Sequence, residues 1–352
     1  MHCHFFIPGL LWPSESLRDA TRDLPLPALE LLLGRGRRNW RPAVGAERWL
    51  AERFGLNGEE LPYGALRLAG EAAEPQSMTR PDAASTSWIC ADPVGLHFAR
   101  EFLVLADSSD LAIEDHEAEQ LIVALNEHCG ELGRFHAAST ERWYLRLNDV
   151  PVLRTHPPAE AVGRRINTFM PSGSDAVRWH RHLNEIQMVL HSHPVNRVRE
   201  EGGRPMINSV WFWGAGIAPR SLSSPYALMI GAQPLARGLA ALAAAEHRQP
   251  GACFDTSALA AGEDGTLVVL DQLARAARQR ERDAWREALA RLETNWFAPA
   301  LAAVRRGRLA RLDLTALGDA SRIDVSIERA ALWQFWRRPL PLASLAPSGH
   351  MP

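Results

Sequence analysis

The chain has 352 residues, of which 46% are apolar and 23% charged, and its formal net charge is −2. These values are those of an ordinary globular protein of about two domains, and they exclude a disordered or collagen-like chain. All 39 basic residues are arginine, which excludes a lysine Schiff base and a Walker-type phosphate loop, and the slight acidic excess argues against a large nucleic-acid-binding surface.

The first third of the chain is predicted to open with a strand and to continue with helices. Residues 4–11 form a short apolar run of the kind found in strands covered on both faces. Residues 28–54 show helical spacing, broken between Gly34 and Pro42. Residues 70–87 are polar, aperiodic and proline-containing, so we expect a loop or domain joint there.

An α+β unit is predicted next. Its elements are strands at 88–90, 101–105 and 143–147 and helices over 114–132 and 175–192. Asp115 is placed to cap the first helix, and Pro194 is placed to end the second.

The last third alternates strands and helices. The pattern predicts strands at 207–216 and 266–270 and helices over 233–245 and 274–304, the last interrupted at Pro299. Residues 207–216 alternate and end in small residues, as a central parallel strand that leads into a glycine-rich turn would. An aromatic docking segment with Trp333, Phe335 and Trp336 is expected near the end of the chain. The alternation predicts an α/β protein, a mostly parallel sheet with an inserted α+β unit.

The location of the protein is indicated by its cysteines and its apolar runs. Cys3, Cys90, Cys129 and Cys253 are far apart, as isolated thiols in a reducing compartment would be. The N-terminus lacks the features of a signal peptide, and no stretch reaches the ~18 apolar residues that a membrane span requires. We therefore expect a cytoplasmic protein without a membrane partner.

The densest polar sequence lies on the helix predicted over 175–192. Its apolar face would be formed by Trp179, Leu183, Ile186 and Leu190. A polar ridge would run beside that face, formed by His180, Asn184, Gln187 and His191. A metal site, a ligand-contacting face and a structural hydrogen-bond network are the three interpretations of this ridge. An asparagine stands four positions after His180, which disfavours a metal site, so we expect no metal and no cofactor.

Two further polar groups are candidate ligand contacts. His193, Asn196, Arg199 and Asn208 precede the Gly214-Ala215-Gly216 turn, and arginine offers a fork for carboxylate or phosphate. At the end of a parallel strand they would face the crevice where open α/β sheets bind ligands. The alternative is that the asparagines cap turns and the glycines permit a bend. Asp92, His97 and Arg100 form the second group, although Asp92-Pro93 favours a β-turn.

The order of these motifs resembles the RpfE-type regulatory proteins of bacteria. The resemblance is carried by 90–94 (CADPV), 142–145 (RWYL), 183–188 (LNEIQM), 193–200 (HPVNRVRE) and 207–216 (INSVWFWGAG). That family in turn is similar to archaeal-type cofactor-independent phosphoglycerate mutases. The resemblance implies an alkaline-phosphatase-like sheet domain formed by residues 1–87 and 201–352, with an inserted lid domain at 88–200.

The sequence departs from the mutases where they bind their two metals. The first strand ends in Ile7-Pro8-Gly9 where the mutases have an Asp-Gly pair, and no counterpart of their serine nucleophile stands between Trp12 and Leu68. Asp271 alone remains near the second metal site. Two-metal phosphoryl transfer needs several converging carboxylates and histidines.

Three functional hypotheses follow. The first is a regulatory or metabolite-sensing protein on a degenerate fold, binding a small anionic metabolite near His180, Asn196, Arg199 and Asn208. The second is an active mutase or phosphatase with an atypical site built from His180, His191, His193 and Asp271. The third is a protein-interaction module that presents tryptophans to a protein partner. No nucleic-acid partner is expected.

Overall fold

The computed structural model describes residues 1–11, 16–72, 86–99, 102–260 and 265–345. The chain divides into two compact units. Unit 1 comprises residues 1–49, 224–232 and 245–352, and unit 2 comprises residues 50–223 and 233–244. The predicted boundaries near residues 88 and 200 both lie within unit 2, and the assignment of 88–200 as an inserted lid stays a prediction.

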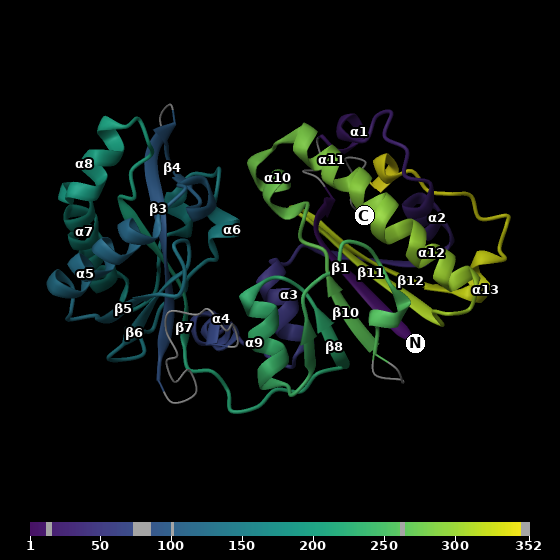
Figure 1. Ribbon diagram of the computed structural model, residues 1–352, viewed down its shortest axis with the longest axis horizontal. Helices are drawn as coiled ribbons and strands as arrows, with labels where there is room; N and C mark the ends of the chain where they lie inside the picture. The colour runs from purple at the N-terminus through teal and green to yellow at the C-terminus, as the bar shows by residue number, and fades with distance from the viewer. Residues whose placement is uncertain (12–15, 73–85, 100–101, 261–264, 346–352) are drawn as a thin grey trace. The chain divides into compact units, whose positions relative to one another are not determined.

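Unit 1 is built on a seven-stranded sheet (Figure 1). Its strands are β1 (His2–Leu11), β2 (Arg37–Pro42), β8 (Tyr226–Ile230), β9 (Glu246–Arg248), β10 (Gly265–Val269), β11 (Arg311–Gly318) and β12 (Ser321–Glu328). They lie in the order β2-β12-β11-β1-β10-β8-β9. From β11 to β9 all pairings are parallel, whereas β12 and β2 are antiparallel. The predicted α/β class with a mostly parallel sheet is confirmed.

The first strand is covered on both faces, as its apolar sequence predicts. Side chains alternate between the faces of a strand. Phe5 and Ile7 are fully buried in one hydrophobic cluster with helices of unit 1. Phe6 points the other way and stacks on Trp49 of α3 (Ala46–Arg53), with ring centroids 4.0 Å apart.

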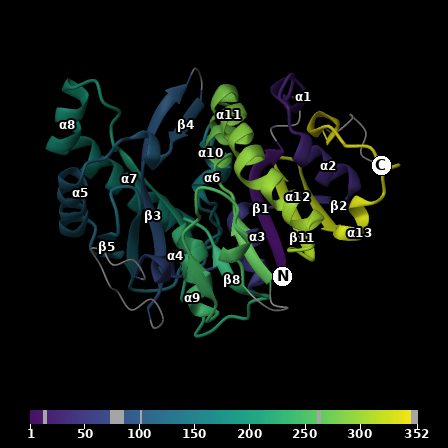
Figure 2. The ribbon, with the colours of Figure 1, turned by 45° about the vertical axis from the view of Figure 1, so that its right-hand side comes forward.

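The helices of unit 1 are short. They are α1 (Leu17–Ala20), α2 (Pro27–Arg35), α10 (Ala274–Gln279), α11 (Arg282–Leu292), α12 (Ala298–Arg305) and α13 (Arg329–Leu332). A π-helical turn, Glu293–Phe297, joins α11 to α12. Pro299 lies in the first turn of α12, directly after this π-helical turn. Figure 2 shows α11 and α12 running along the sheet.

Unit 2 has an antiparallel sheet. Its strands are β3 (Trp88–Ala99), β4 (Phe102–Ala106), β5 (Gly133–Ala137), β6 (Trp143–Leu147) and β7 (Ser209–Gly216). Its helices are α4 (Tyr63–Ala72), α5 (Asp115–His128), α6 (Pro158–Ala161), α7 (Ala176–Ser192), α8 (Pro194–Glu201) and α9 (Pro234–Leu242). Apolar side chains of α5, α7 and this sheet form one buried cluster.

Two expectations about strands were wrong. Strand β7 is not a central parallel strand but pairs antiparallel with β3, so the residues before it do not lie at a parallel sheet's C-terminal edge. A run in which side chains alternate and which ends in glycine occurs in parallel and antiparallel strands alike, so the run does not reveal the direction of the strand. Asp92-Pro93 is not a turn but lies inside β3, where residues 91–94 pair with β7 alone. Pro93, which has no N–H, therefore interrupts no ladder on the opposite side.

Three details of the helices also differ from the expectations. Glu114, not Asp115, caps α5, and it forms a capping box with Glu117. Pro194 does not terminate the helical region but occupies the first position of α8. The proposed joint at 70–87 begins within α4, and residues 73–85 lie outside the described residues. All four cysteines are free, and none of the helices described is long and apolar enough to cross a membrane.

Candidate functional site

Helix α7 presents the buried face that its sequence predicts. Trp179, Leu183, Ile186 and Leu190 are each at most 6% exposed. Trp179 meets Phe212 of β7 edge-on, with ring centroids 4.9 Å apart. This packing fixes the rotation of α7, and with it the direction of the neighbouring polar residues.

Three residues of the polar ridge line a groove of about 430 Å³ in unit 2. Asn184, Gln187 and His191 contribute from α7, together with Met188. The other lining residues are Leu96 of β3, Leu103 of β4 and Asn208. The structure thus brings together three of the predicted ligand contacts: Asn184, His191 and Asn208.

The polar side chains of this groove differ in whether they form hydrogen bonds within the fold. Asn208 accepts a hydrogen bond from the Leu96 N–H at 2.7 Å and donates one to the Leu96 carbonyl at 2.9 Å. Gln187 donates to the Ser209 hydroxyl at 3.2 Å. Asn184 and His191 are exposed, and their side chains have no hydrogen bond or ion pair with any described residue. These two side chains are therefore available to a ligand.

The other candidate histidines are dispersed. His180 Nε2 lies 2.8 Å from the Pro171 carbonyl oxygen, with which it hydrogen-bonds. His193 caps α8 by accepting from the Val195 N–H at 3.2 Å, and burial lowers the pKa of its imidazole. His97 is exposed on β3, opposite Val104 of β4.

Asn196 is fully buried and holds three segments together. Its amide nitrogen donates to the carbonyl oxygens of Leu190, at 2.7 Å, and of Ile207, at 2.8 Å. Its amide oxygen accepts from the Ile207 N–H at 2.8 Å. Both amide hydrogens and the oxygen are thus engaged within the fold.

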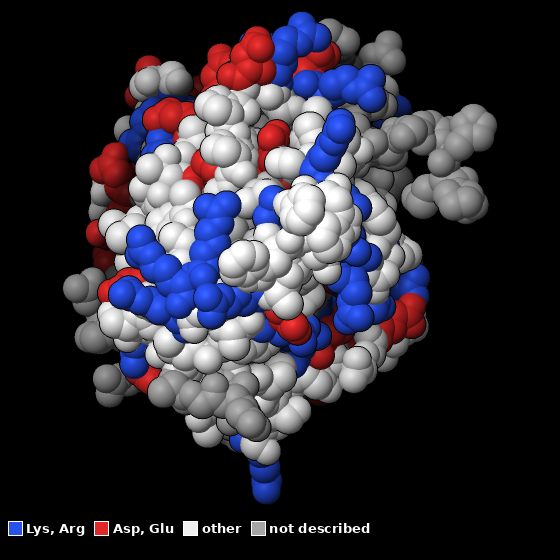
Figure 3. Space-filling model, turned by 90° about the vertical axis from the view of Figure 1, so that its right-hand side faces the viewer, with Lys and Arg blue, Asp and Glu red and all other residues white. Residues whose placement is uncertain are grey.

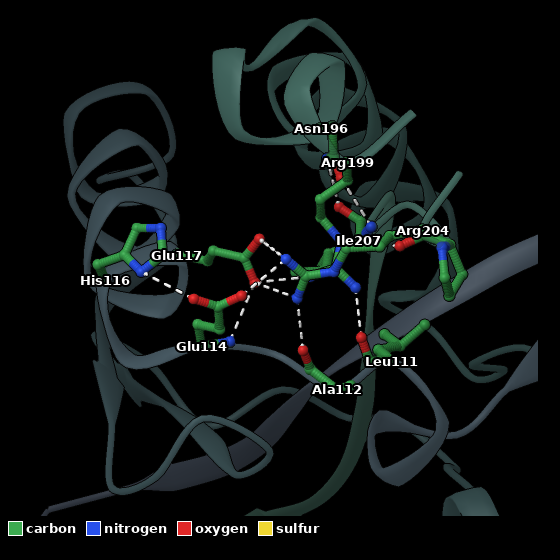
Figure 4. A network of polar contacts seen from close by, with 10 residues as sticks. Leu111, Ala112, Glu114, His116, Glu117, Asn196, Arg199, Arg204 and Ile207 are labelled. Carbon is green, nitrogen blue, oxygen red and sulfur yellow. Dashed lines mark hydrogen bonds and ion pairs between the residues drawn. The ribbon is translucent and has the colours of Figure 1, made fainter. Parts of the chain in front are cut away.

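Arg199 is also fully buried, and its guanidinium is surrounded by acceptors of unit 2 (Figure 4). Nη1 donates to Glu117 at 2.6 Å, Nε donates to the Pro205 carbonyl at 2.8 Å, and Nη2 donates to the Leu111 carbonyl. Glu117 also pairs with Arg204 at 3.2 Å. Burial lowers the pKa of Arg199, and Glu117 opposes that effect. The guanidinium expected to hold an anion instead faces a carboxylate of its own fold.

Asp92 belongs to a second buried network. It accepts two hydrogen bonds from Arg67, at 2.8 and 2.6 Å, and one from the Trp213 indole at 2.8 Å. Tyr144 accepts from Arg67 at 2.7 Å and donates to Glu71 at 2.9 Å. Burial raises the pKa of Tyr144 well above its usual value.

The partners of Asp92 were not among the residues predicted from the sequence. Arg67, Glu71 and Tyr144 carry this network, and one signal was present: Arg67 interrupts the apolar face of α4. A buried arginine needs a carboxylate partner, which would have directed attention to Asp92.

The described residues do not supply a two-metal donor set. No group of three or more His, Cys, Asp and Glu residues that could hold a metal ion occurs within the described ranges. Asp271 follows β10 without forming part of such a group. Arg100, predicted as an anion contact, lies outside the described residues. The described side chains therefore do not fit the two metals that the resemblance to the mutases implies.

Comparison with known proteins points to one enzyme family. A family model described as 2,3-bisphosphoglycerate-independent phosphoglycerate mutase matches residues 96–196. The middle of this chain is similar to these mutases. The phosphoglycerate mutase 2 of that type from Methanothermobacter thermautotrophicus is 34% identical over 152 residues, which cover 40% of this chain and 37% of that protein. A probable mutase of the same type from Geobacter sulfurreducens is 33% identical over 132 residues, covering 37% and 33%.

The similarity has a limited span in sequence and a wider one in fold. The chain spans just over a third of the length of the mutase from Methanothermobacter. The segment that the family model matches contains the groove residues of α7. Among solved structures, the PH0037 protein from Pyrococcus horikoshii covers 92% of this chain and 87% of its own, with a TM-score of 0.50 and 14% identity. This likeness shows that the chain shares its fold with the PH0037 protein, in agreement with the predicted α/β architecture.

Proposed function

We propose that this protein is a regulatory or metabolite-sensing protein that keeps a phosphoglycerate-mutase-like fold without the two-metal catalytic set. The observation that carries the proposal is the donor set: in the described part of the chain, no three metal-binding side chains converge. Two-metal phosphoryl transfer requires such convergence on both metals. Membership of the RpfE-type regulatory family is part of this proposal.

The groove of unit 2 is the proposed ligand site. Asn184 and His191 offer polar atoms that the fold does not use, and Gln187 lies between them on α7. A small phosphorylated or carboxylated metabolite would accept hydrogen bonds from these side chains, while Leu96 and Leu103 would cover its apolar part. Arg199 and Asn196 are positioning residues in this proposal, because their polar groups are engaged inside the fold.

Isothermal titration calorimetry with 2- and 3-phosphoglycerate tests the proposed site. We expect the wild type to bind one of them and the double substitution Asn184→Ala/His191→Ala to weaken binding about tenfold or more, because two hydrogen bonds are lost. His116→Ala is the control, since His116 is exposed on α5 outside the groove. Absence of binding to the wild type, or equal weakening by the control, would remove the basis for a sensor of these metabolites.

An active mutase or phosphatase is the second candidate, favoured by the names of the similar proteins. It would need a site different from the two-metal arrangement. His180 and His193 are already engaged with backbone groups, so His191 is the member of the predicted histidine set whose side chain is available. Turnover of phosphoglycerate that depends on His191 would support this candidate over the sensor.

A further inference from the structure

Two arginine pairs from opposite ends of the chain meet at one pocket of unit 1. Arg37 and Arg38 lie on β2, and Arg337 and Arg338 lie in the segment after α13. The pocket measures about 440 Å³, and its other lining residues are Gly34, Gly36 and Leu340. Figure 3 shows arginine side chains gathered on the face of the molecule that carries these elements.

The backbone of unit 1 holds the two pairs together. A Cβ atom on Gly34 would lie 2.2 Å from the Arg338 carbonyl oxygen, so the tail packs directly against the last turn of α2. The Leu340 N–H donates to the Glu30 carbonyl oxygen at 2.9 Å, which fixes the tail one turn earlier on the same helix. The backbone packing of the tail against α2 therefore brings the four arginines together.

No carboxylate of the described residues pairs with the arginines at this pocket. The side chains of Arg37, Arg38 and Arg338 have no hydrogen bond or ion pair with any described residue. Arg337 donates to the Arg35 carbonyl oxygen at 3.4 Å and pairs with no carboxylate in the described ranges. Like charges held close together destabilise a fold, whereas an anion between them would stabilise it. Arg199 and Arg67, by contrast, each have a buried carboxylate partner.

We propose that this pocket is a binding site for a small, multiply phosphorylated anion. Guanidinium groups bind phosphate oxygens through two parallel N–H donors, and several such forks suit adjacent phosphates. The pocket volume lies in the range of small-molecule sites. The net charge of −2 and the small size of the pocket that these four arginines line favour a compact ligand over a nucleic-acid strand. This site lies in unit 1 and is independent of the groove proposed in unit 2.

Calorimetry with inorganic tripolyphosphate tests the site. We expect the wild type to bind it, and the substitutions Arg37→Gln/Arg38→Gln and Arg337→Gln/Arg338→Gln each to weaken binding about tenfold or more. The matched control is Arg305→Gln/Arg306→Gln, an exposed arginine pair at the end of α12 that does not line the pocket. Citrate, which carries carboxylates, is expected to bind more weakly.

A second measurement separates binding from folding. Without ligand, we expect both pocket variants to unfold at a Tm equal to or higher than that of the wild type, because they relieve repulsion between the arginines. Tripolyphosphate is expected to raise the Tm of the wild type and of the control variant only. Vesicles of phosphatidylcholine with and without phosphatidic acid test whether the phosphate belongs to a lipid headgroup. Vesicle binding that is lost in both pocket variants would support the phosphate site and would identify a lipid headgroup as the source of the phosphate. Absence of binding to both probes, equal weakening by the control pair, or equal binding of citrate would overturn the proposal.

Discussion

Arg199 and Glu117 form an ion pair whose side chains are 0% and 5% exposed. Removing one partner of a buried pair leaves the other charge uncompensated, which costs about 3–5 kcal/mol. We therefore expect Arg199→Ala to lower the free energy of unfolding by about that amount in urea denaturation. Arg204→Ala is the comparison, because the side chain of Arg204 is 35% exposed and its loss should cost about 1 kcal/mol. A cost of Arg199→Ala no larger than that of Arg204→Ala would contradict the structural role.

His136 makes stability depend on pH. Burial, with help from the charges of Arg134 and Arg146, lowers the pKa of His136 below its usual value, and its Nε2 is buried without a partner among the described residues. The unfolded chain therefore binds a proton more readily than the folded one. The stability contributed by neutral His136 is complete above the unfolded pKa of about 6.5 and is lost as the pH falls through the lower folded pKa.

His136→Gln tests this dependence. We expect the variant to lose less stability than the wild type between about pH 8 and about pH 5, as measured by urea midpoints. His116→Gln, at an exposed position, serves as the reference. An unchanged pH dependence in His136→Gln would show that other groups, such as His193, account for it.

Residue types were predictable at the candidate site, but their surroundings were not. The sequence showed that Asn196 and Arg199 have strong hydrogen-bonding groups, yet such groups serve a ligand or a backbone equally well. The choice depends on Ile207 and Glu117, whose approach is set by tertiary packing. Asn184 and His191 could be placed on one ridge by helical spacing alone, because that relation is local.

Helix α2 shows how an element can depend on a distant side chain. Its N-cap position, Leu26, offers no side-chain acceptor. Glu293, in the π-helical turn, accepts hydrogen bonds from the N–H groups of Ala28 at 2.6 Å and Leu29 at 3.1 Å. Burial raises the pKa of Glu293, although these two bonds act in the opposite direction. A carboxylate here satisfies donors that the first turn of a helix leaves open.

Glu293→Ala is expected to destabilise the protein by about 1–3 kcal/mol, because two buried N–H groups lose their acceptor. Chemical denaturation followed by circular dichroism would measure the change. Glu287→Ala removes an exposed carboxylate from the same helical region and should change stability by about 0.5 kcal/mol or less. Equal effects of the two substitutions would refute the capping role.

Elements were predicted well where one local pattern dominated. Strands β1 and β10 and helix α7 have uninterrupted apolar or helical patterns, and the structure confirms them. The antiparallel pair β11 and β12 was not predicted, although apolar residues alternate with polar ones along both strands: Leu312, Leu314 and Ala316 in β11, and Ile323, Val325 and Ile327 in β12. Helix α8 was not predicted, because a proline such as Pro194 can either follow the end of a helix or occupy the first position of the next one. The sequence alone does not distinguish the two roles.

Across the whole molecule, the tryptophans that the structure describes fall into two groups. Trp49, Trp88, Trp143, Trp179, Trp211, Trp213, Trp285 and Trp296 are buried. Trp40, Trp333 and Trp336 are exposed, the last two near the end of unit 1. Most described indoles are therefore part of the hydrophobic cores, and within the described residues the protein-interaction hypothesis is limited to the three exposed tryptophans.

Our main proposal is that a phosphoglycerate-mutase-like fold persists here without two-metal catalysis. The most direct test is a mutase assay of the purified chain with 2- and 3-phosphoglycerate in the presence of Mn²⁺, Zn²⁺ or Mg²⁺, with the metal content measured on the same sample. We expect no interconversion above the protein-free control and no stoichiometric metal. Interconversion accompanied by two tightly bound metal ions per chain would contradict it.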